Sequence, residues 1–349
     1  MKNKEKITIA VSGLNAIDSP GPGIPVIRGL RESDHFSPRI IGLAYDNLEP
    51  GIYMQDLVDR VYTVPYPSEG SEAILEKIRL IHEQERIDII IPNFDAEIAP
   101  YIKISPALNA LDIKTLLPTA SQFEERQKHN LTPFGRKYDI SVPESIMVNS
   151  PGELEKAVSS LGLPVMVKGK YYEAVLVYHL EEAAKWFYKI SAKWGLPIIL
   201  QQYLPGEEYN VAGLGDGEGN TIAAVCMRKQ YITDKGKAWG GISISDPRLI
   251  ELTGSFVKKT QWRGPFELEM IKDKRGDYHL LEINPRMPAW IYLAVRAGQN
   301  IPDAIIQLTL KGHIPPLKNY MTGKMFLRYS WDMIIDVAEF QKFSMKGER

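Results

Sequence analysis

The chain of 349 residues contains one cysteine, Cys226, and almost no net charge, because 42 basic side chains balance 43 acidic ones. A single cysteine excludes a disulfide framework and any cysteine-rich zinc or iron–sulfur site. The balanced charge argues against binding nucleic acid or an anionic membrane through bulk electrostatics. No apolar run approaches the ~18–20 residues of a membrane span, and the run Ile7–Val11 is too short for a signal peptide. These absences predict a cytoplasmic protein.

Several common catalytic motifs are also missing. The six histidines show no metal-ligand spacing, and neither a Walker A nor a G-x-S-x-G sequence occurs. The loop Ser12–Gly23, which follows the first apolar run, lacks the G-x-G-x-x-G pattern of dinucleotide-binding folds. The sequence therefore excludes these zinc, P-loop and serine-hydrolase motifs and does not support dinucleotide binding.

The composition, with 44% hydrophobic and 24% charged residues, is typical of a globular protein of about two domains. The first ~120 residues alternate strand and helix patterns, which predicts a doubly wound α/β domain with a parallel sheet. Its expected elements are strands at 7–11, 40–44, 61–64 and 88–92 and helices at 25–32 and 68–85.

The remaining chain predicts a small α+β lobe followed by a larger lobe with an antiparallel sheet. The small lobe is expected to contain helices from 150 to 161 and at 180–194, and strands at 164–168, 174–178 and 198–203. In the large lobe we expect strands at 208–214, 221–231, 265–271 and 278–284, a helix opened by Asp246, and a later helix from 300 to 311. The last eight residues, KFSMKGER, are expected to fray.

The most informative stretch is a predicted hairpin of strands 266–271 and 279–284, joined by a loop at 274–277. Strand alternation places polar side chains of both strands on one face: Glu267, Glu269, Glu282 and Asn284. Leu281 and Ile283 are expected to face the core. The register pairs residue 269 with 282 and residue 267 with 284.

Carboxylates directly opposite each other destabilise a sheet, and a bound Mg²⁺ ion relieves that repulsion with ligands of this oxygen type. The alternative is an ordinary hairpin with a charged face in solvent. Alternation alone leaves both interpretations open, and on its own it favours the solvent face.

The segment Glu282-Ile-Asn-Pro-Arg286 resembles the E-x-N-P-R signature of the ATP-grasp superfamily, with Glu269 thirteen residues upstream. The pattern is similar to carbamoyl-phosphate synthetase lobes, biotin carboxylase and stand-alone carboxylate–amine ligases. This resemblance implies that Glu269, Glu282 and Asn284 hold Mg²⁺, with Mn²⁺ as an alternative ion. It assigns Arg286 to anionic oxygens of the transferred phosphoryl group or acyl phosphate, and gives Glu267 no role.

The resemblance extends over essentially the whole chain through weaker matches. It implies an ATP site in which Lys128 and Lys168 contact the phosphates and Glu208 binds the ribose. The hinge residues that would hydrogen-bond adenine are Gln201, Gln202, Tyr203 and Leu204. It also implies that Arg228 holds a substrate carboxylate or acyl phosphate. Taken singly, each motif also fits a surface lysine or arginine, or a plain strand and turn.

One departure concerns the segment after Lys168, where the family carries a glycine-rich flap over the phosphates. Here the sequence is Gly169-Lys170-Tyr171-Tyr172, with a single glycine. Tyrosines wrap phosphates with backbone N–H groups less freely than glycines do. Either Lys170 supplies side-chain charge instead, or the phosphates are weakly covered.

Loops at the carboxyl ends of parallel strands are where open sheets bind ligands. Asn15 and Asp18 follow the first strand, and Asp95 and Glu97 follow the strand at 88–92. We therefore consider Asn15, Asp18 and Asp95, with Glu97 beside them, as contacts for an acceptor substrate. A purely structural loop is the alternative in each case.

The resemblance implies an N-terminal α/β domain at 1–118, linker helices and a lid subdomain at 119–204, and a large subdomain at 205–349. It implies an ATP-dependent, Mg²⁺-dependent ligase that joins a small-molecule or peptide carboxylate to an amine through an acyl phosphate, and it allows a homodimer. Two alternatives stay open. One is a non-catalytic ATP-binding module, favoured by the missing glycine flap, and the other is a bicarbonate-using carboxylase or carbamoyl-phosphate-forming enzyme.

Overall fold

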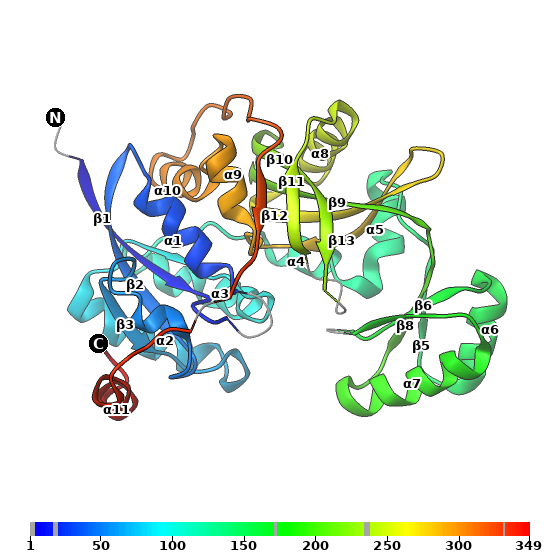
Figure 1. Cartoon of the computed structure of the whole chain (residues 1–349), viewed down its shortest axis with the longest axis horizontal. Coiled ribbons are helices and arrows are strands. Elements are labelled where there is room, and N and C mark those ends of the chain that lie inside the picture. The colour runs from blue at the N-terminus through cyan, green and yellow to red at the C-terminus, as the bar shows by residue number, and fades with distance from the viewer. Residues whose placement is uncertain (1–3, 17–19, 171–172, 234–237, 331) are drawn as a thin grey trace.

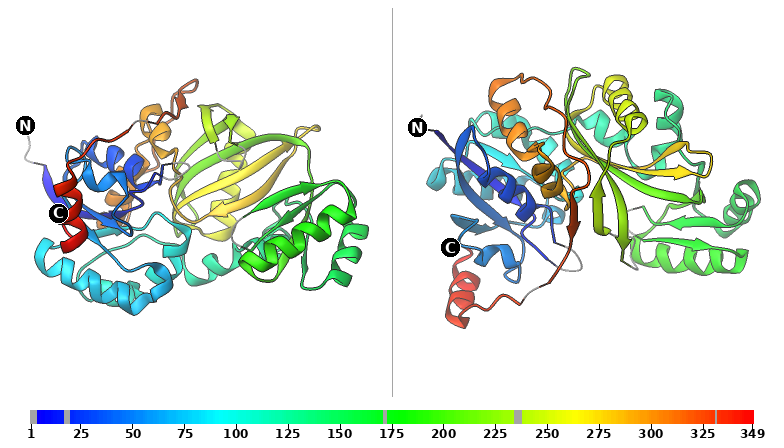
Figure 2. Two further views of the ribbon diagram at one scale, coloured as in Figure 1. Left: turned by 60° about the horizontal axis from the view of Figure 1, so that its bottom comes forward. Right: turned by 45° about the horizontal axis from the view of Figure 1, so that its top comes forward.

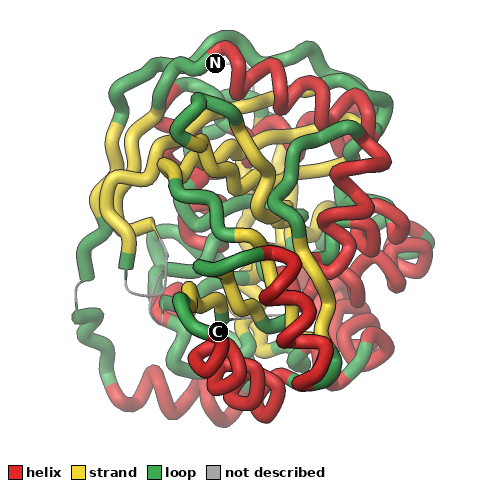
Figure 3. Tube along the Cα trace, turned by 90° about the vertical axis from the view of Figure 1, so that its right-hand side faces the viewer, coloured by secondary structure: helices red, strands yellow, loops and turns green. Residues whose placement is uncertain are grey.

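The computed structural model describes residues 4–16, 20–170, 173–233, 238–330 and 332–349. Its strands form three sheets, which lie in an N-terminal domain, a lid and a large lobe (Figure 1). The strands run through the interior with helices packed around them (Figure 3). Within the described residues, none of the helices combines the length and apolar character that crossing a bilayer requires.

The N-terminal domain has four parallel strands in the order β3-β2-β1-β4. Its elements are β1 (Glu5–Ser12), α1 (Gly23–Arg31), β2 (Phe36–Ala44), β3 (Arg60–Thr63), α2 (Ser71–Glu85), β4 (Ile89–Ile91) and α3 (Asp95–Asn109). The strands are apolar on both faces because α1 covers one face and α2 and α3 cover the other. The doubly wound architecture is confirmed.

The C-terminal residues are ordered against this domain, so the expectation that they fray is wrong. Helix α11 (Val337–Lys346) buries Phe343, and the chain then pairs with the edge strand β3. Val61 and Arg349 exchange backbone hydrogen bonds of 3.0 and 2.9 Å. The open backbone groups of β3 provide this partner, and nothing in the local sequence of the C-terminus reveals it.

The lid is an antiparallel sheet in the order β5-β8-β6-β7, with two helices on one face. Its elements are β5 (Ser145–Val148), α6 (Pro151–Leu161), β6 (Val165–Lys168), β7 (Ala174–Val177), α7 (Leu180–Trp194) and β8 (Ile198–Gln202). Ser150 caps α6 as predicted, by accepting a hydrogen bond from the Glu153 N–H. The lid has a hydrophobic core of its own and projects from the rest of the molecule (Figure 2).

The large lobe is a six-stranded antiparallel sheet in the order β13-β12-β9-β10-β11-β14. Its elements are β9 (Gly206–Asp216), β10 (Thr221–Ile232), β11 (Ala238–Ser243), α8 (Pro247–Thr260), β12 (Arg263–Asp273), β13 (Tyr278–Asn284), α9 (Ile291–Ala297), α10 (Ile301–Lys311) and β14 (Met325–Leu327). Helix α8 covers one face, and α9 and α10 cover the other and pack on α1. The N-terminal domain and the large lobe therefore share one core.

The linker helix α5 (Leu131–Tyr138) belongs with the large lobe and not with the lid, whereas α4 (Ala120–Glu125) packs Phe123 against the core of the N-terminal domain. Leu131 and Phe134 are buried in the core beneath α8, where the Phe134 ring lies 6.3 Å from that of Phe256. The predicted grouping of residues 119–204 therefore splits near residue 140. Amphipathic helices show which face is buried, but the partner of that face is a tertiary property.

Candidate active site

The predicted carboxylate hairpin is present, and its register is confirmed where it matters. Glu269 is paired with Glu282 and Glu267 with Asn284, across β12 and β13. A β-bulge then shifts the pairing, so that Met270 lies opposite Leu280 and Leu281 is the extra residue. Leu280, rather than the predicted Leu281, consequently packs in the core.

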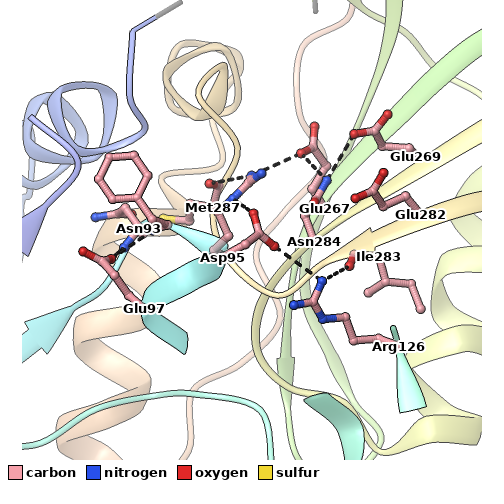
Figure 4. Close-up of polar contacts among 12 residues, drawn as sticks. Asn93, Asp95, Glu97, Arg126, Glu267, Glu269, Glu282, Ile283, Asn284 and Met287 are labelled. Carbon is pink, nitrogen blue, oxygen red and sulfur yellow. Dashed lines mark hydrogen bonds and ion pairs between the residues drawn. The ribbon is translucent and has the colours of Figure 1, made fainter. Parts of the chain in front are cut away.

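The polar face of this hairpin does not lie in open solvent. Glu267 and Asn284 are 5% and 3% exposed. The Asn284 amide nitrogen donates to both Glu267 and Glu269, at 3.1 Å in each case (Figure 4). The solvent-face alternative is therefore wrong.

Glu267, which had no assigned role, is held by donors from three elements. Its carboxylate accepts hydrogen bonds from the Asn210 amide at 2.8 Å and from the Trp290 indole at 2.7 Å, in addition to the bond from Asn284. Burial raises the pKa of Glu267, and repulsion from Glu269 raises it further. Glu267 therefore organises the site from beneath, with its oxygens already engaged.

Three lysines from three parts of the chain meet these acids. Lys128 lies 3.3 Å from Glu282, and Lys229 lies 2.6 Å from Glu208 and 3.5 Å from Glu269. Burial alone would lower the pKa of Lys229, but attraction to Glu269 and Glu208 raises it. Burial would raise the pKa of Glu269, but attraction to Lys229, Lys128 and Arg286 together lowers it.

The third lysine, Lys168, comes from the lid at the end of β6. Its ammonium donates to the Gln201 Oε1 atom at 2.6 Å, and the Gln201 Nε2 atom donates to Ser145 at 3.0 Å. Burial lowers the pKa of Lys168, against attraction from Glu282, Glu269 and Glu208 of the large lobe. The lid lysine thus lies within electrostatic reach of the hairpin acids, as the sequence predicts.

The residues assigned to the hinge lie between the lid and the large lobe. Gln201 and Gln202 end β8 of the lid, and Tyr203 and Leu204 lie in the short link to β9 of the large lobe. Glu208 is paired with Ile271 on β12 and holds Lys229. Lys170 lies in the β6–β7 loop, and Tyr171 and Tyr172 of the predicted flap lie outside the described residues.

The donor set fits a hard divalent cation. Glu269 and Glu282 face each other as a register pair with side chains 30% and 27% exposed, and Asn284 adds an amide next to Glu269. Two carboxylates and an amide oxygen leave positions for phosphate oxygens, which is how proteins usually bind Mg²⁺. In the described part of the chain, no group of three or more His, Cys, Asp or Glu side chains has metal-binding geometry. The set is therefore suited to an ion that also has ligands from a nucleotide.

Arg228 is not brought to this site, which corrects its predicted placement. It is paired with Tyr209, and Tyr209 faces the core beneath α8, on the other side of the sheet from Glu269. Because successive side chains of a strand alternate, its neighbour Lys229 points to the acids instead. The strand lies where the sequence predicts it, but neighbouring residues of a strand point to opposite faces of the sheet, so Lys229 takes the place expected for Arg228.

Arg286 reaches the site but is bound from both sides. Its Nε donates to Asp95 at 2.9 Å, and its Nη1 lies 3.4 Å from Glu267. A second arginine, Arg126, was missed by the sequence analysis; its Nη1 lies 3.5 Å from Asp95 and 3.4 Å from the Ile283 carbonyl. Its only sequence signal is its position two residues before Lys128. Asp95 is therefore an ion-pair partner of two arginines, and its role as a substrate contact stays a prediction.

Glu97 is a structural anchor, so its consideration as a substrate contact is wrong. It is fully buried, and it accepts hydrogen bonds from Ser12, Tyr45 and the backbone N–H groups of Asn93 and Phe94. Asn15 lies in the loop after β1, where its backbone carbonyl accepts from Gly21 at 2.8 Å. Asp18 lies outside the described residues.

Glu49, in the loop after β2, gives a pH-dependent prediction for stability. Burial raises its pKa to about 7, and the residue is 4% exposed. The folded state therefore favours the protonated form, and stability falls as pH rises from about 4.5 to about 7. We expect Glu49→Gln to increase the free energy of unfolding by up to about 3 kcal/mol at pH 8 and by less than about 1 kcal/mol at pH 5.

Urea unfolding of both proteins at the two pH values checks this expectation. Glu76→Gln, on the exposed face of α2, is the matched control and should change stability little at either pH. An equal effect of Glu49→Gln at pH 5 and pH 8 would show that Glu49 does not titrate as its burial requires.

Comparison with known proteins gives one family model and many relatives. Residues 196–328 match the model described as "ATP-grasp in the biosynthetic pathway with Ter operon". The carbamoyl phosphate synthase large chain of Clostridium beijerinckii is 26% identical over 284 residues, which cover 75% of this chain and 25% of that relative. The chain thus spans about a quarter of the length of the curated relatives it matches.

Solved structures resemble the whole fold. The biotin carboxylase domain of Hydrogenobacter thermophilus 2-oxoglutarate carboxylase, solved with MgADP and bicarbonate, has a TM-score of 0.69 at 16% identity, covering 92% of this chain and 72% of that one. An L-amino acid ligase from Bacillus licheniformis has a TM-score of 0.64 at 18% identity, covering 89% and 75%. At these identities the likeness concerns the fold.

Proposed function

We propose that this chain is a member of the ATP-grasp superfamily, and that it is a Mg²⁺-dependent ligase that uses ATP to join a carboxylate to an amine. The observation that carries the proposal is the pair of opposed carboxylates, Glu269 and Glu282, which form ion pairs with Lys229 and Lys128, with Lys168 of the lid close enough to be attracted to both acids. These residues come from the linker, the lid and the large lobe. A surface hairpin would have no reason to gather them.

The nucleotide contacts follow from this arrangement. Lys168 and Lys128 are proposed to hold the phosphates, and the backbone of the hinge 201–204 to hold adenine. Glu208, next to Lys229 at 2.6 Å, is proposed to accept hydrogen bonds from ribose hydroxyls. Glu269, Glu282 and Asn284 would hold Mg²⁺, which when bound would neutralise charge on the phosphate oxygens.

The proposed reaction has two steps. A carboxylate oxygen of the substrate attacks the γ-phosphorus of ATP, which releases ADP and forms an acyl phosphate. The amine then attacks the acyl carbon, and phosphate leaves. The chain supplies no nucleophile: Lys168 and Arg286 stabilise negative charge, and the fold aligns the reactants.

The similarity to the L-amino acid ligase, of which this chain covers 75%, favours an amine as the acceptor. The matched carbamoyl phosphate synthase and biotin carboxylase favour bicarbonate as a second candidate carboxylate. A cytoplasmic location and a homodimer remain part of the proposal, and the buried Cys226 is compatible with a reducing compartment.

A screen of ADP release tests the proposal. Purified protein with MgATP is supplied with amino acids, dipeptides, small organic acids or bicarbonate, alone and in pairs. We expect ADP release that depends on one carboxylate and a product mass that identifies the amine. Calorimetry that shows ATP-analogue binding, combined with no ADP release for any substrate, would contradict the ligase and support a non-catalytic ATP-binding module.

A further inference from the structure

The first turn of α3, in the N-terminal domain, reaches the catalytic hairpin of the large lobe through one side chain. The two carboxylate oxygens of Asp95 engage different arginines: Oδ2 accepts from the Arg286 Nε at 2.9 Å, and Oδ1 lies 3.5 Å from the Arg126 Nη1. Arg126 also lies 3.4 Å from the carbonyl of Ile283, on β13 next to Asn284 (Figure 4). Asp95 is thus connected to both the arginine and the metal-ligand strand.

The electrostatics favour a permanent ion pair. Burial would raise the pKa of Asp95, but Arg286 and Arg126 lower it. Burial would likewise lower the pKa of Arg286, and attraction to Asp95 and Glu267 raises it. The Arg286 and Asp95 side chains are 17% and 34% exposed, so the pair is partly buried. Removing the charge of Asp95 would leave Arg286 to find another position or partner.

The helix that presents Asp95 is itself fixed. Glu97, two residues on, accepts from the N–H groups of Asn93 and Phe94 at 2.8 and 2.9 Å and from the Ser12 hydroxyl at 2.6 Å. These bonds tie the start of α3 to β1 and to the end of β4. Asp95 is therefore held by the backbone of a parallel sheet and does not depend on a flexible loop.

The segment that carries Arg286 is fixed to the same body. Met287 and Trp290 follow it directly, are 1% and 5% exposed, and pack in the core shared by α1 and α9. The lid has a separate core. Movement of the lid on substrate binding would consequently leave the distance between Asp95 and Arg286 unchanged.

We propose that Asp95 is a positioning residue, which orients the Arg286 guanidinium toward the anionic oxygens of the substrate. The Nε atom of Arg286 donates to Asp95, and its Nη1 atom donates to Glu267 and the Met287 carbonyl. Among the described residues, none accepts a hydrogen bond from its Nη2. The guanidinium is thereby anchored on two sides, and Nη2, which lies between the anchored groups, remains for a ligand. The role of Arg286 in this inference rests on the proposed function.

Two readouts in the full-length chain test this inference. In ¹⁵N–¹H spectra, the Arg286 Nε–H resonance, assigned through its loss in Arg286→Lys, should shift in Asp95→Asn and return toward its original position in Asp95→Glu. In steady-state assays, Asp95→Asn should lower kcat by about 100-fold, as misplacement of a reacting group does, with KM for ATP within about twofold. Asp56→Asn, at an exposed aspartate in the segment between β2 and β3, is the matched control.

Each outcome decides the inference. An unshifted Nε–H resonance in Asp95→Asn, or a kcat within twofold of the starting protein, would overturn it. A raised KM for the carboxylate or amine with unchanged kcat would instead identify Asp95 as a direct substrate contact and would also overturn it. If the unmodified protein releases no ADP with any substrate, the proposed function fails, and the resonance alone decides whether Asp95 positions Arg286.

Discussion

Replacing Glu282 with glutamine is expected to lower substrate-dependent ADP release by at least about 100-fold, as the loss of one charge at a preorganised site commonly does. Glutamine has the same shape but cannot neutralise a divalent cation as a carboxylate does. Glu282 is the register partner of Glu269, so its charge completes the carboxylate pair that we propose binds Mg²⁺. The dependence of the rate on Mg²⁺ concentration should shift to higher concentrations at the same time.

The competing explanation for Glu282 is a partly exposed ion pair with Lys128. Such pairs contribute about 0–1 kcal/mol to stability and nothing to catalysis. Under that explanation Glu282→Gln would retain full ADP release. Glu76→Gln is the matched control, and thermal unfolding of both variants should lie close to that of the unmodified protein, because Glu282 is 27% exposed.

Replacing Lys168 with methionine is expected to weaken binding of a non-hydrolysable ATP analogue by about 10- to 100-fold, the size of one or two charge-assisted hydrogen bonds. Stability should behave differently from binding. Since burial lowers the pKa of Lys168, the folded state carries a cost for its charge at neutral pH, and this cost is lost only as pH approaches 10.5. Methionine removes the cost but also leaves the Gln201 Oε1 atom without its donor.

We therefore expect the melting temperature of Lys168→Met to stay close to that of the unmodified protein while nucleotide binding falls. Isothermal calorimetry and thermal unfolding measure the two effects. Lys156→Met, on the exposed face of α6 in the same lid, is the matched control and should change neither. Equal affinity of the two variants would identify Lys168 as a surface lysine and remove it from the ATP site.

The local parts of the site could be predicted from the sequence. A four-residue loop and a period of two predict the Glu269–Glu282 pair. The structure contains that pair, but the pairing next to the loop differs by one residue, and the bulge at Leu281 offsets the difference. The Ser150 cap and the apolar strands of the parallel sheet were predictable because they are properties of neighbouring residues. The bulge that places Leu280 in the core was not, because a single extra residue leaves no distinct pattern in the sequence.

Long-range partners could not be predicted in this way. Arg228 and Lys229 lie on opposite faces of the sheet, and which of them faces the acids depends on which face packs against α8. In the structure Lys229, and not Arg228, lies beside Glu208. Arg126 is 31 residues from Asp95 in the sequence, and Arg286 is 191 residues from it. The contact between Asp95 and Arg286 forms only because the N-terminal domain packs on α9 and α10.

The sequence by itself determined the class of fold, the carboxylate hairpin and the residue types that suit Mg²⁺ and phosphate, because these depend on periodicity and on chemistry carried within short segments. Only the tertiary structure decided which charges meet, where the linker helices and the C-terminal residues pack, and that Asp95 is held by two arginines. The physical reason is that an ion pair depends on the distance between two side chains, and that distance is set by the packing of the shared core.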